Sequence, residues 1–411
     1  MGRTCPGEIV YAFMKASCIV LFFAVATAAT AHAEPPTAFA GCIAELRSEA
    51  AAKGITAKTF DAALAGIEPD PTVLDAMDTQ PEFETPIWEY LATLVSDRRI
   101  AEGQVRLVTW APVLARAEQQ YGVDRFTIVA VWGVESDYGR IVGKRSLVRS
   151  LATISCAGTR QRYFRTELMA ALQILQAGDV KPDSLRGSWA GAFGHTQFMP
   201  STYQRSAVDF DGDGRRDLVD SIPDALGSVA NYLKRAGWIT GQRWGYEVRL
   251  PKEYHGPSGR HGRQEIEEWT RLGVTRMDGT ALTGEGPAAL LLPTGTRGPA
   301  FIVFRNFDAI HSYNASESYA LAIAHLADRL RGGGPLQASW PTDDPILSRT
   351  ERRELQEKLI ERGFLAGDAD GIVGSRTVAA VRAFQTSAGL PSDGYASSSV
   401  LKALKETAAP K

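Results

Sequence analysis

The most strongly apolar helical pattern in the chain begins after Asp124. Apolar side chains fill nearly every position from Phe126 to Val134, which is typical of a helix that is buried on all sides. Asp124 is a suitable N-cap for this helix, and Gly139 can end it. Glu135 lies on the last turn, where the buried helix ends. We therefore expect a carboxylic acid on a cleft wall, where loss of water raises its pKa.

The remaining pattern predicts a chain made mostly of helices. Apolar residues recur at three- and four-residue spacing in residues 39–53, 57–67, 87–96, 99–121, 162–176, 222–237 and 316–331. Short strand-like runs occur between residues 240 and 310, at 246–250, 290–292 and 301–304. The predicted fold class is therefore mainly α, of the α+β type, with a small β-containing insertion.

Glycine and proline divide the chain into a large and a small part. Gly332-Gly333-Gly334-Pro335 ends the helical pattern, so we expect a large domain over residues 34–333 and a linker over 334–345. Apolar helical segments and two Asp-Gly turns over residues 346–405 predict a small three-helix C-terminal domain. A unit of about sixty residues can fold alone.

The N-terminus has the pattern of an export signal. Lys15 precedes an apolar run over residues 18–30, and an Ala-x-Ala cleavage site follows at Ala33. We expect residues 1–33 to be a signal peptide that is cleaved after Ala33, which leaves a periplasmic protein without a stable membrane span. The alternative is a single-span anchor, for which the apolar run is short.

Charge and cysteine content narrow the class of protein. The formal net charge is -2, and Lys and Arg are dispersed, so no nucleic-acid partner is expected. Removal of the signal removes Cys5 and Cys18 and leaves Cys42 and Cys156. Two remaining cysteines in an exported protein predict one disulfide, and two free buried thiols are the alternative.

Glu135 has the setting of a general acid. A protonated carboxyl can donate to the leaving oxygen of a glycosidic bond, and a hydrolase normally adds a second carboxylate. Asp137 lies two positions after Glu135, and side chains at that spacing face different sides of a helix. The pattern therefore favours one carboxyl that first gives a proton and then removes one from a nucleophile within the substrate, with no cofactor required. The alternative is a helix-end Glu that points into water.

A glycine-rich segment over residues 187–203 supplies candidate binding groups. Glycines let a backbone approach a ligand closely, and Ser188 and Gln197 add hydrogen-bonding groups. Apolar Phe198 and Met199 beside these polar groups favour a ligand groove. A tight structural turn is the alternative.

An acidic loop follows with the spacing of a calcium site. Asp residues at positions one, three and five precede a glycine, but Asp220 stands at position twelve in place of the usual Glu. A structural Ca²⁺ is therefore one prediction, and a turn braced by Arg215 and Arg216 is the alternative. The candidate metal-site residues are Asp209, Asp211, Asp213, Arg215, Asp220 and Asp224.

Several separated motifs carry a family resemblance. They are Val131-Trp132-Gly133-Val134-Glu135-Ser136-Asp137-Tyr138-Gly139, Ser188-Trp189-Ala190-Gly191-Ala192-Phe193-Gly194 with Gln197-Phe198-Met199-Pro200-Ser201, and Tyr313-Asn314 with Ser316 and Tyr319. Through them, residues 40–331 resemble the membrane-bound lytic transglycosylase B family, lysozyme-like enzymes that cut peptidoglycan. The C-terminal domain resembles the peptidoglycan-binding domain 1 family through Leu355-Gln356, Asp370-Gly371-Ile372 and Phe384-Gln385.

The resemblance implies a function and a set of site residues. Glu135 matches the acid and base that cleaves the β-1,4 bond between N-acetylmuramic acid and N-acetylglucosamine and leaves a 1,6-anhydromuramyl end. The residues that match substrate-binding groups are Ser188, Gln197, Tyr313, Asn314, Tyr319, Tyr232 and Tyr90. The acidic loop matches a calcium loop of some members.

Two other functions remain open from the sequence. A muramidase of the same fold would use water and release reducing ends. A non-catalytic wall-binding protein would not need an acid in an apolar helix. In each case the partner is the glycan strand of peptidoglycan, on which the C-terminal domain would raise the local concentration.

Overall fold

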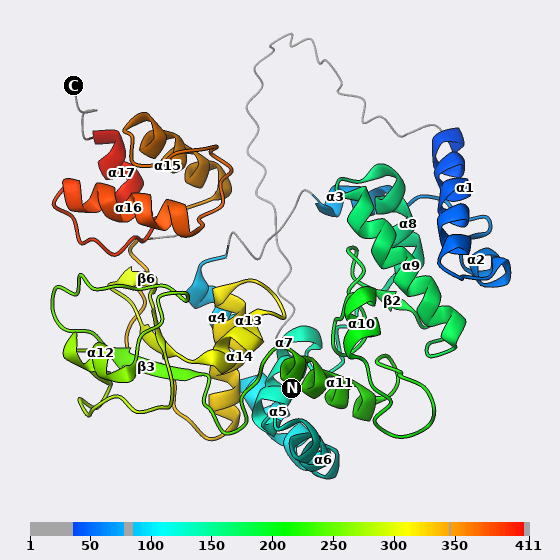
Figure 1. The fold of residues 1–411 in the computed structure, drawn as a ribbon, viewed down its shortest axis with the longest axis horizontal. Coiled ribbons are helices and arrows are strands. Elements are labelled where there is room, and N and C mark those ends of the chain that lie inside the picture. The colour runs from blue at the N-terminus through cyan, green and yellow to red at the C-terminus, as the bar shows by residue number, and fades with distance from the viewer. Residues whose placement is uncertain (1–35, 78–84, 345–346, 407–411) are drawn as a thin grey trace, which may run out of the picture.

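The computed structural model describes residues 36–77, 85–344 and 347–406 (Figure 1). Helices dominate these ranges, and six of the seven described strands form two small antiparallel sheets, which confirms the predicted fold class. The predicted signal peptide, residues 1–33, lies outside the described residues. Among the helices of the described ranges, none is both long enough and apolar enough to span a membrane.

One group of helices packs around an apolar cluster that includes Leu46, Phe60, Leu151, Leu168 and Phe193. These helices are α1 (Pro36–Ala52), α2 (Ala57–Leu64), α3 (Pro71–Met77), α8 (Leu147–Ala157), α9 (Gln161–Ala177) and α10 (Pro200–Ser206). Figure 1 shows α1, α2, α8 and α9 together on one side of the molecule.

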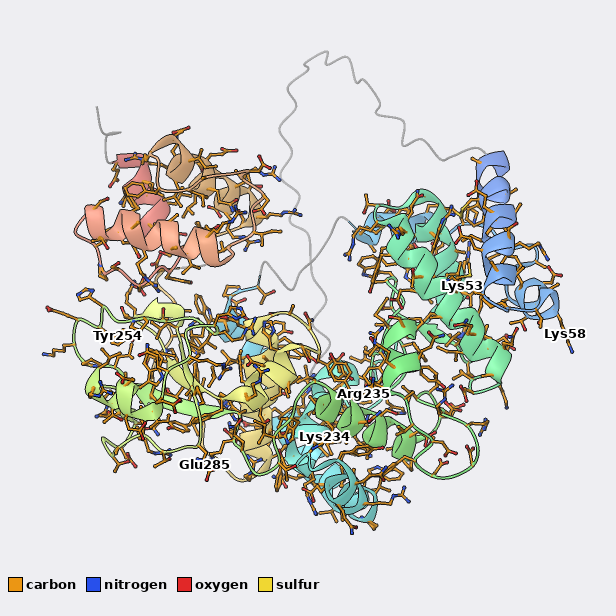
Figure 2. All side chains as sticks on the ribbon, viewed as in Figure 1. Lys53, Lys58, Lys234, Arg235, Tyr254 and Glu285 are labelled. Carbon is orange, nitrogen blue, oxygen red and sulfur yellow. A yellow bond between two sulfur atoms is a disulfide. The ribbon has the colours of Figure 1, made fainter. Side chains whose placement is uncertain are left out.

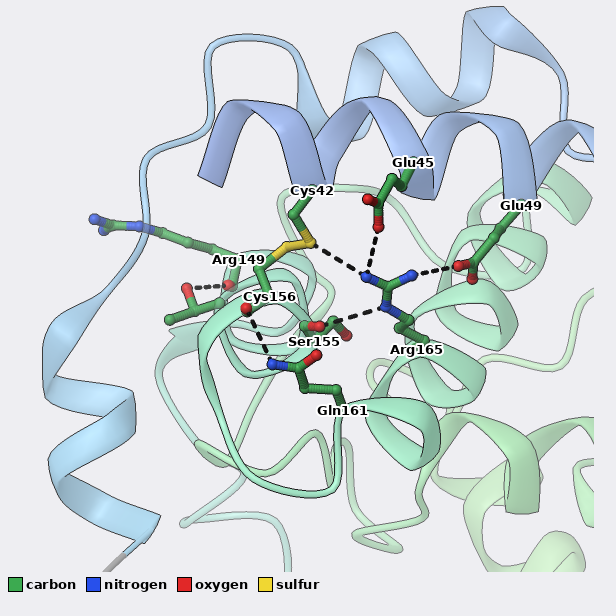
Figure 3. Close-up of a disulfide and its surroundings, with 9 residues drawn as sticks. Cys42, Glu45, Glu49, Arg149, Ser155, Cys156, Gln161 and Arg165 are labelled. Atoms are coloured by element: carbon green, nitrogen blue, oxygen red, sulfur yellow. Dashed lines mark hydrogen bonds and ion pairs between the residues drawn. A yellow bond between two sulfur atoms is a disulfide. The ribbon is translucent and has the colours of Figure 1, made fainter. Parts of the chain in front are cut away.

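A disulfide closes this helical group. Cys42 of α1 and Cys156 of α8 are joined with an S–S distance of 2.02 Å (Figure 3). Beside the disulfide, Arg165 of α9 forms ion pairs with Glu45 at 3.0 Å and Glu49 at 2.5 Å. Since 114 residues separate the two cysteines, the bond restricts a long stretch of the unfolded chain.

A second group of helices surrounds α7 (Arg125–Ser136). The other members are α4 (Ile87–Leu94), α5 (Asp97–Thr109), α6 (Ala111–Tyr121), α11 (Ile222–Arg235), α13 (Arg305–His311) and α14 (Glu317–Leu330). Helices α14, α5, α11 and α6 all pack directly on α7. Every residue from Thr127 to Gly133 is buried, so the apolar pattern of this helix correctly predicted a helix inside the core.

The predicted helix over residues 99–121 is wrong in one respect, because the structure has two helices there. Helix α5 ends at Thr109, and Trp110 is both the C-cap of α5 and the N-cap of α6. Pro112 lies in the first turn of α6. Proline lacks the N–H of a continuing helix and clashes with the preceding turn, so the chain changes direction at this point.

The insertion forms a four-stranded antiparallel sheet with the strand order β4-β3-β7-β5. The elements of the insertion are β3 (Gly245–Arg249), α12 (Ile266–Arg271), β4 (Thr275–Arg276), β5 (Ala289–Leu291), β6 (Pro293–Thr296) and β7 (Ala300–Val303), of which α12 and β6 lie outside the sheet. Ile302 lies opposite Leu290 and Tyr246 in the register, and Trp269 is fully buried in this core. A separate pair, β1 (Arg145–Ser146) and β2 (Arg186–Gly187), joins the segment after α7 to the glycine-rich loop.

The C-terminal part contains α15 (Arg349–Glu361), α16 (Ser375–Ser387) and α17 (Ser398–Glu406), as the three-helix prediction requires. Leu355, Val381, Phe384 and Leu404 belong to its own apolar core. Figure 1 shows these helices next to β6 of the insertion.

Candidate active site

Glu135 lies on the last turn of α7. At the other end of this helix, Asp124 accepts the N–H of Thr127 at 3.1 Å and caps the first turn. The chain turns sharply after the helix, because Asp137 and Tyr138 have φ angles of 51° and 59°. Residues other than glycine seldom adopt such values, so neighbouring groups must stabilise this turn.

Three arginines stabilise the turn through the carboxylate of Asp137. Arg98, Arg99 and Arg140 lie 3.1, 3.2 and 2.7 Å from its oxygens, and Asp137 is only 7% exposed. Asp137 is therefore committed to the turn and is no second free carboxylate beside Glu135. The helix ends at Ser136, with Asp137 as its left-handed C-cap, and these ion pairs compensate for the unfavourable backbone conformation.

Tyr138 packs into a space that only glycine leaves open. A Cβ on Gly133 would lie 2.8 Å from atoms of the Tyr138 ring. The Tyr138 hydroxyl donates to the carbonyl oxygen of Arg99 at 2.9 Å, and its ring meets Trp132 edge-on at 5.6 Å. These contacts fix the end of α7 and so the direction in which the Glu135 side chain leaves it.

The carboxyl of Glu135 has a single hydrogen-bond partner among the described residues, the hydroxyl of Tyr319 on α14, which donates to Oε1. Burial raises the pKa of Glu135 to about 8, and the Tyr319 hydrogen bond acts in the opposite direction. Loss of water is the cause, since no charged neighbour contributes to the shift. The carboxyl is therefore mostly protonated at neutral pH.

Aromatic rings gather next to this carboxyl. Tyr319 is almost fully buried, and its ring stacks near that of Tyr313, with the centroids 6.4 Å apart. Tyr232 lies 4.7 Å from Tyr313, and Phe198 lies 5.5 Å from Tyr313. Residues from α11, α14 and the glycine-rich loop thus form one aromatic cluster beside Glu135.

Hydrogen bonds to the backbone hold two of these rings in place. The Tyr313 hydroxyl donates to the carbonyl oxygen of Thr196 at 2.7 Å, and the Tyr232 hydroxyl donates to that of Ser312 at 2.7 Å. Because both phenols are already engaged as donors, their contribution to a ligand is mainly the apolar face of a fixed ring.

Ser188 and Gln197 shape the glycine-rich loop. The Oγ of Ser188 accepts the N–H of Ala192 at 3.0 Å. The side-chain nitrogen of Gln197 donates to the carbonyl oxygens of Gly194 at 2.8 Å and Val142 at 3.2 Å. The predicted structural turn is therefore present. A serine hydroxyl and a glutamine amide have more than one hydrogen-bonding position, so the Ser188 hydrogen and the Gln197 carbonyl oxygen can still serve a ligand.

His195 joins this loop to α7, a contact that the sequence did not predict. The indole N–H of Trp132 donates to His195 Nδ1 at 3.0 Å, and the Ser136 hydroxyl donates to the His195 carbonyl oxygen at 2.8 Å. Burial lowers the pKa of His195, so the ring is neutral and accepts at Nδ1. A histidine inside a glycine-rich loop has no periodic signal, so the sequence could not predict this contact.

Two further predicted residues lie at different positions around the aromatic cluster. Tyr90 is on α4, which packs on α14, and it is close enough to Tyr319 to help raise the pKa of that phenol. Asn314 lies in the turn before α14 and is exposed. The structure thus gathers the tyrosines around Glu135 and leaves the Asn314 side chain accessible to solvent.

The acidic loop brings three of its candidate ligands together. Carboxylate oxygens of Asp209, Asp211 and Asp213 lie within 4.8 Å of one another, and all three residues are exposed. Oxygen groups of this kind suit Ca²⁺. Arg215 forms an ion pair with Asp213 at 2.8 Å, so the braced turn that the sequence left as an alternative is also present.

The other acidic candidates lie outside this group. Asp224, on the first turn of α11, is fully buried and accepts the N–H groups of Phe210 at 2.7 Å, Asp211 at 3.2 Å and Asp217 at 2.8 Å. Both carboxylate oxygens thus accept backbone N–H groups, so Asp224 braces the loop. Asp220 is exposed and is not part of the cluster.

The helix-rich fold and a protonated acid among tyrosines are those of a lysozyme-like, glycan-cleaving protein. The sequence matches the transglycosylase SLT domain family over residues 38–328 and a peptidoglycan binding domain family over residues 348–404. The chain belongs to the transglycosylase SLT domain family, the lytic transglycosylases that act on peptidoglycan.

Known relatives agree with this assignment. The chain is 36% identical over 267 residues to the membrane-bound lytic murein transglycosylase B of Escherichia coli (strain K12). The aligned region covers 62% of this chain and 73% of that protein. The fold is similar to that of SltB3 from Pseudomonas aeruginosa in complex with NAG-NAM-pentapeptide, with a TM-score of 0.87 and 47% identity over 89% of this chain and 99% of that chain. The Escherichia coli lytic transglycosylase Slt35 in complex with calcium has a TM-score of 0.62 and 32% identity over 72% of this chain and 92% of that chain.

Glu135→Gln is expected to stabilise the folded protein more at alkaline than at acidic pH. In the unfolded chain the carboxyl ionises above its ordinary pKa of 4.5, whereas the folded carboxyl keeps its proton up to about pH 8. Rising pH through this interval therefore favours unfolding, and glutamine removes that effect. Urea unfolding at about pH 5 and about pH 9 measures the difference in the free energy of unfolding.

Glu285→Gln is the matched control for this comparison, because Glu285 is an exposed carboxyl on the insertion (Figure 2). It should change stability little at either pH. If Glu135→Gln gave the same change at both pH values, the raised pKa of Glu135 would be refuted.

Proposed function

We propose that this protein cleaves the β-1,4 bond between N-acetylmuramic acid and N-acetylglucosamine and leaves a 1,6-anhydromuramyl end, with Glu135 as the only acid and base. The observation that carries this proposal is a carboxyl with a raised pKa, hydrogen-bonded by Tyr319 alone. A structure of the relative SltB3 was determined in complex with NAG-anhNAM-pentapeptide, which supports the same type of product here.

The reaction begins with the protonated form of Glu135. The carboxyl gives its proton to the glycosidic oxygen while the bond from C1 of the muramyl residue to that oxygen breaks, and the N-acetylglucosamine side leaves as an alcohol. The carboxylate then takes the proton of the C6 hydroxyl of the same muramyl residue as the C6 oxygen bonds to C1. Glu135 is protonated again at the end, and no water is consumed.

The second candidate, a muramidase that uses water, needs a further base or nucleophile. The carboxylate nearest in sequence, Asp137, is neutralised by Arg98, Arg99 and Arg140. Its engagement favours the route in which the substrate supplies the nucleophile. Tyr319 fits both steps, because its hydroxyl can stabilise the carboxylate that exists between them.

Substrate binding is assigned to groups around Glu135. The rings of Tyr232, Tyr313, Tyr319 and Tyr90 would offer apolar faces to sugar rings. Ser188, Gln197 and Asn314 would offer hydrogen bonds to hydroxyl and acetamido groups.

The larger organisation follows from the same function. We infer a periplasmic protein whose signal peptide is cleaved after Ala33, with residues 34–333 as the catalytic domain. Residues 334–345 would link it to the binding domain over residues 346–405. The binding domain would hold the catalytic domain near peptidoglycan and raise its local concentration.

The variant Glu135→Gln tests the catalytic proposal. Muropeptides released from purified sacculi are analysed by mass spectrometry. The unmodified protein should release products that are lighter by one water than reducing muropeptides. Glu135→Gln should lower the rate by roughly a hundredfold or more, since it removes general acid and base catalysis.

Glu285→Gln is the control and should release anhydro products at the rate of the unmodified protein. Reducing products from the unmodified protein would favour the muramidase. Cleavage by Glu135→Gln at the full rate would exclude Glu135 as the acid.

A structural Ca²⁺ at Asp209, Asp211 and Asp213 is the second part of the proposal, and a metal would offset the repulsion among these carboxylates. Calcium at about a hundred times its dissociation constant should stabilise the fold by roughly 2.7 kcal/mol. Mg²⁺ should do so less, because it prefers a stricter geometry. Thermal unfolding with each ion, after treatment with a chelator, measures both effects.

The double variant Asp211→Asn/Asp213→Asn should abolish the calcium-dependent rise in Tm, because it removes two negative charges while keeping hydrogen-bonding oxygens. Asp183→Asn, at an exposed position outside the loop, should keep the rise. An equal rise in the double variant would place calcium elsewhere.

A further inference from the structure

The C-terminal domain docks on the insertion through polar contacts. The N–H of Thr296 donates to the carboxylate of Asp393 at 3.4 Å, and Arg382 donates to the hydroxyl of Ser258 at 2.6 Å. Gly295 lies close against the domain, since a Cβ there would be 2.2 Å from an Asp393 oxygen. These contacts place side chains of the C-terminal domain beside the start of α14.

A cavity of about 80 Å³ lies at this junction. It is lined by Ile87, Pro293, Thr294, Glu317, Ser318 and Tyr395. Three parts of the chain therefore build it together: α4 and α14 of the catalytic part, β6 of the insertion and the C-terminal domain. Such a space holds a small polar group rather than a whole sugar ring.

Among the described residues, Glu317 is the one carboxylate that lines this cavity. Within the described residues it has no hydrogen-bond partner and no ion pair. Burial raises the pKa of Glu317, and the charge of Arg260 opposes that shift. Arg260 itself forms an ion pair with Asp308 at 3.2 Å. An unpaired carboxylate that lines a cavity between two domains favours a hydrogen-bond donor in that cavity.

Helix capping does not account for this arrangement. An acidic residue in the first turn of α14 interacts favourably with the helix dipole, but an exposed side chain would provide the same benefit. Here the side chain of Glu317 is half-buried and lines the cavity together with Tyr395 of the C-terminal domain. The combination of a carboxylate and an aromatic ring is typical of sites that bind a primary ammonium.

We propose that the cavity between Glu317 and Tyr395 binds a free side-chain ammonium of the peptide that peptidoglycan carries on its muramyl residue. The ammonium would donate to the Glu317 carboxylate and lie against the Tyr395 ring. This inference rests on the proposed function, because it assumes that the muramyl residue lies beside Glu135.

The position of Glu317 makes this contact possible for a bound glycan. Glu317 and Tyr319 are the first and third residues of α14, so they point to roughly opposite sides of the helix. The peptide branches from the same muramyl residue that Glu135 acts on. An extended peptide spans about 3.3 Å per residue, so a few residues would pass from one side of the α14 N-terminus to the other.

Binding to the full chain in the Glu135→Gln background tests the proposal while the ligand stays intact. Isothermal titration calorimetry compares a peptidoglycan fragment whose peptide has a free side-chain amine with the same fragment after acetylation of that amine. The free amine should bind roughly ten- to hundredfold more tightly, as a hydrogen bond between charged groups does. Adding Glu317→Gln should reduce this preference to about one.

Glu285→Gln in the same background is the control and should keep the preference, because Glu285 is an exposed carboxyl on the insertion and does not line the cavity. Tyr395→Phe should keep most of the preference, whereas Tyr395→Ala should weaken it, since only the ring is required.

Equal binding of the two ligands to the Glu135→Gln chain would overturn the proposal, and so would a preference that survives Glu317→Gln. The first comparison needs no change at Glu317, so a variant that folds poorly does not affect it. Failure of the proposed function can be distinguished from failure of this inference. It would appear as a lack of cleavage by the unmodified chain, however tightly the two ligands bind.

Discussion

Loss of water around the Glu135 carboxyl, with the Tyr319 hydroxyl as its hydrogen-bond partner, keeps a proton on this group at neutral pH. The proposed proton transfer depends on this interaction, since a proton must be present on Glu135 before a glycosidic oxygen can accept it. The hydrogen bond from Tyr319 has the opposite effect on the pKa and favours the carboxylate. The same pair can thus serve both the protonated and the ionised state during a cycle.

The surrounding fold keeps this carboxyl in a fixed position. An apolar helix brings it to the edge of the core, and the ion pairs of Asp137 stabilise a left-handed turn directly after it. His195 then joins the turn region to the glycine-rich loop, which is joined in turn to the aromatic cluster through Tyr313. In the proposed reaction, preorganisation of this kind would allow a single acid to act without large rearrangement.

Much of the fold and the position of Glu135 at the end of a buried helix could be predicted from sequence, because burial leaves a strong pattern. The run before Glu135 has no polar face, and the structure places that helix inside the core. The break at Pro112 was missed because apolar periodicity continues across it, although proline at that position is a physical reason for two helices. The roles of loop residues were harder to predict. Nothing in the sequence position of Asp224 distinguishes an ion ligand from a carboxylate that accepts three backbone N–H groups.

The most direct measurement is a titration of the Glu135 carboxyl by NMR. The folded protein is labelled with ¹³C at glutamate side-chain carboxyls, and the signal is assigned by its loss in Glu135→Gln. A pKa of about 8 is expected for this carboxyl. A value near the ordinary 4.5 would mean that the group is ionised at neutral pH, which would contradict its role as the acid.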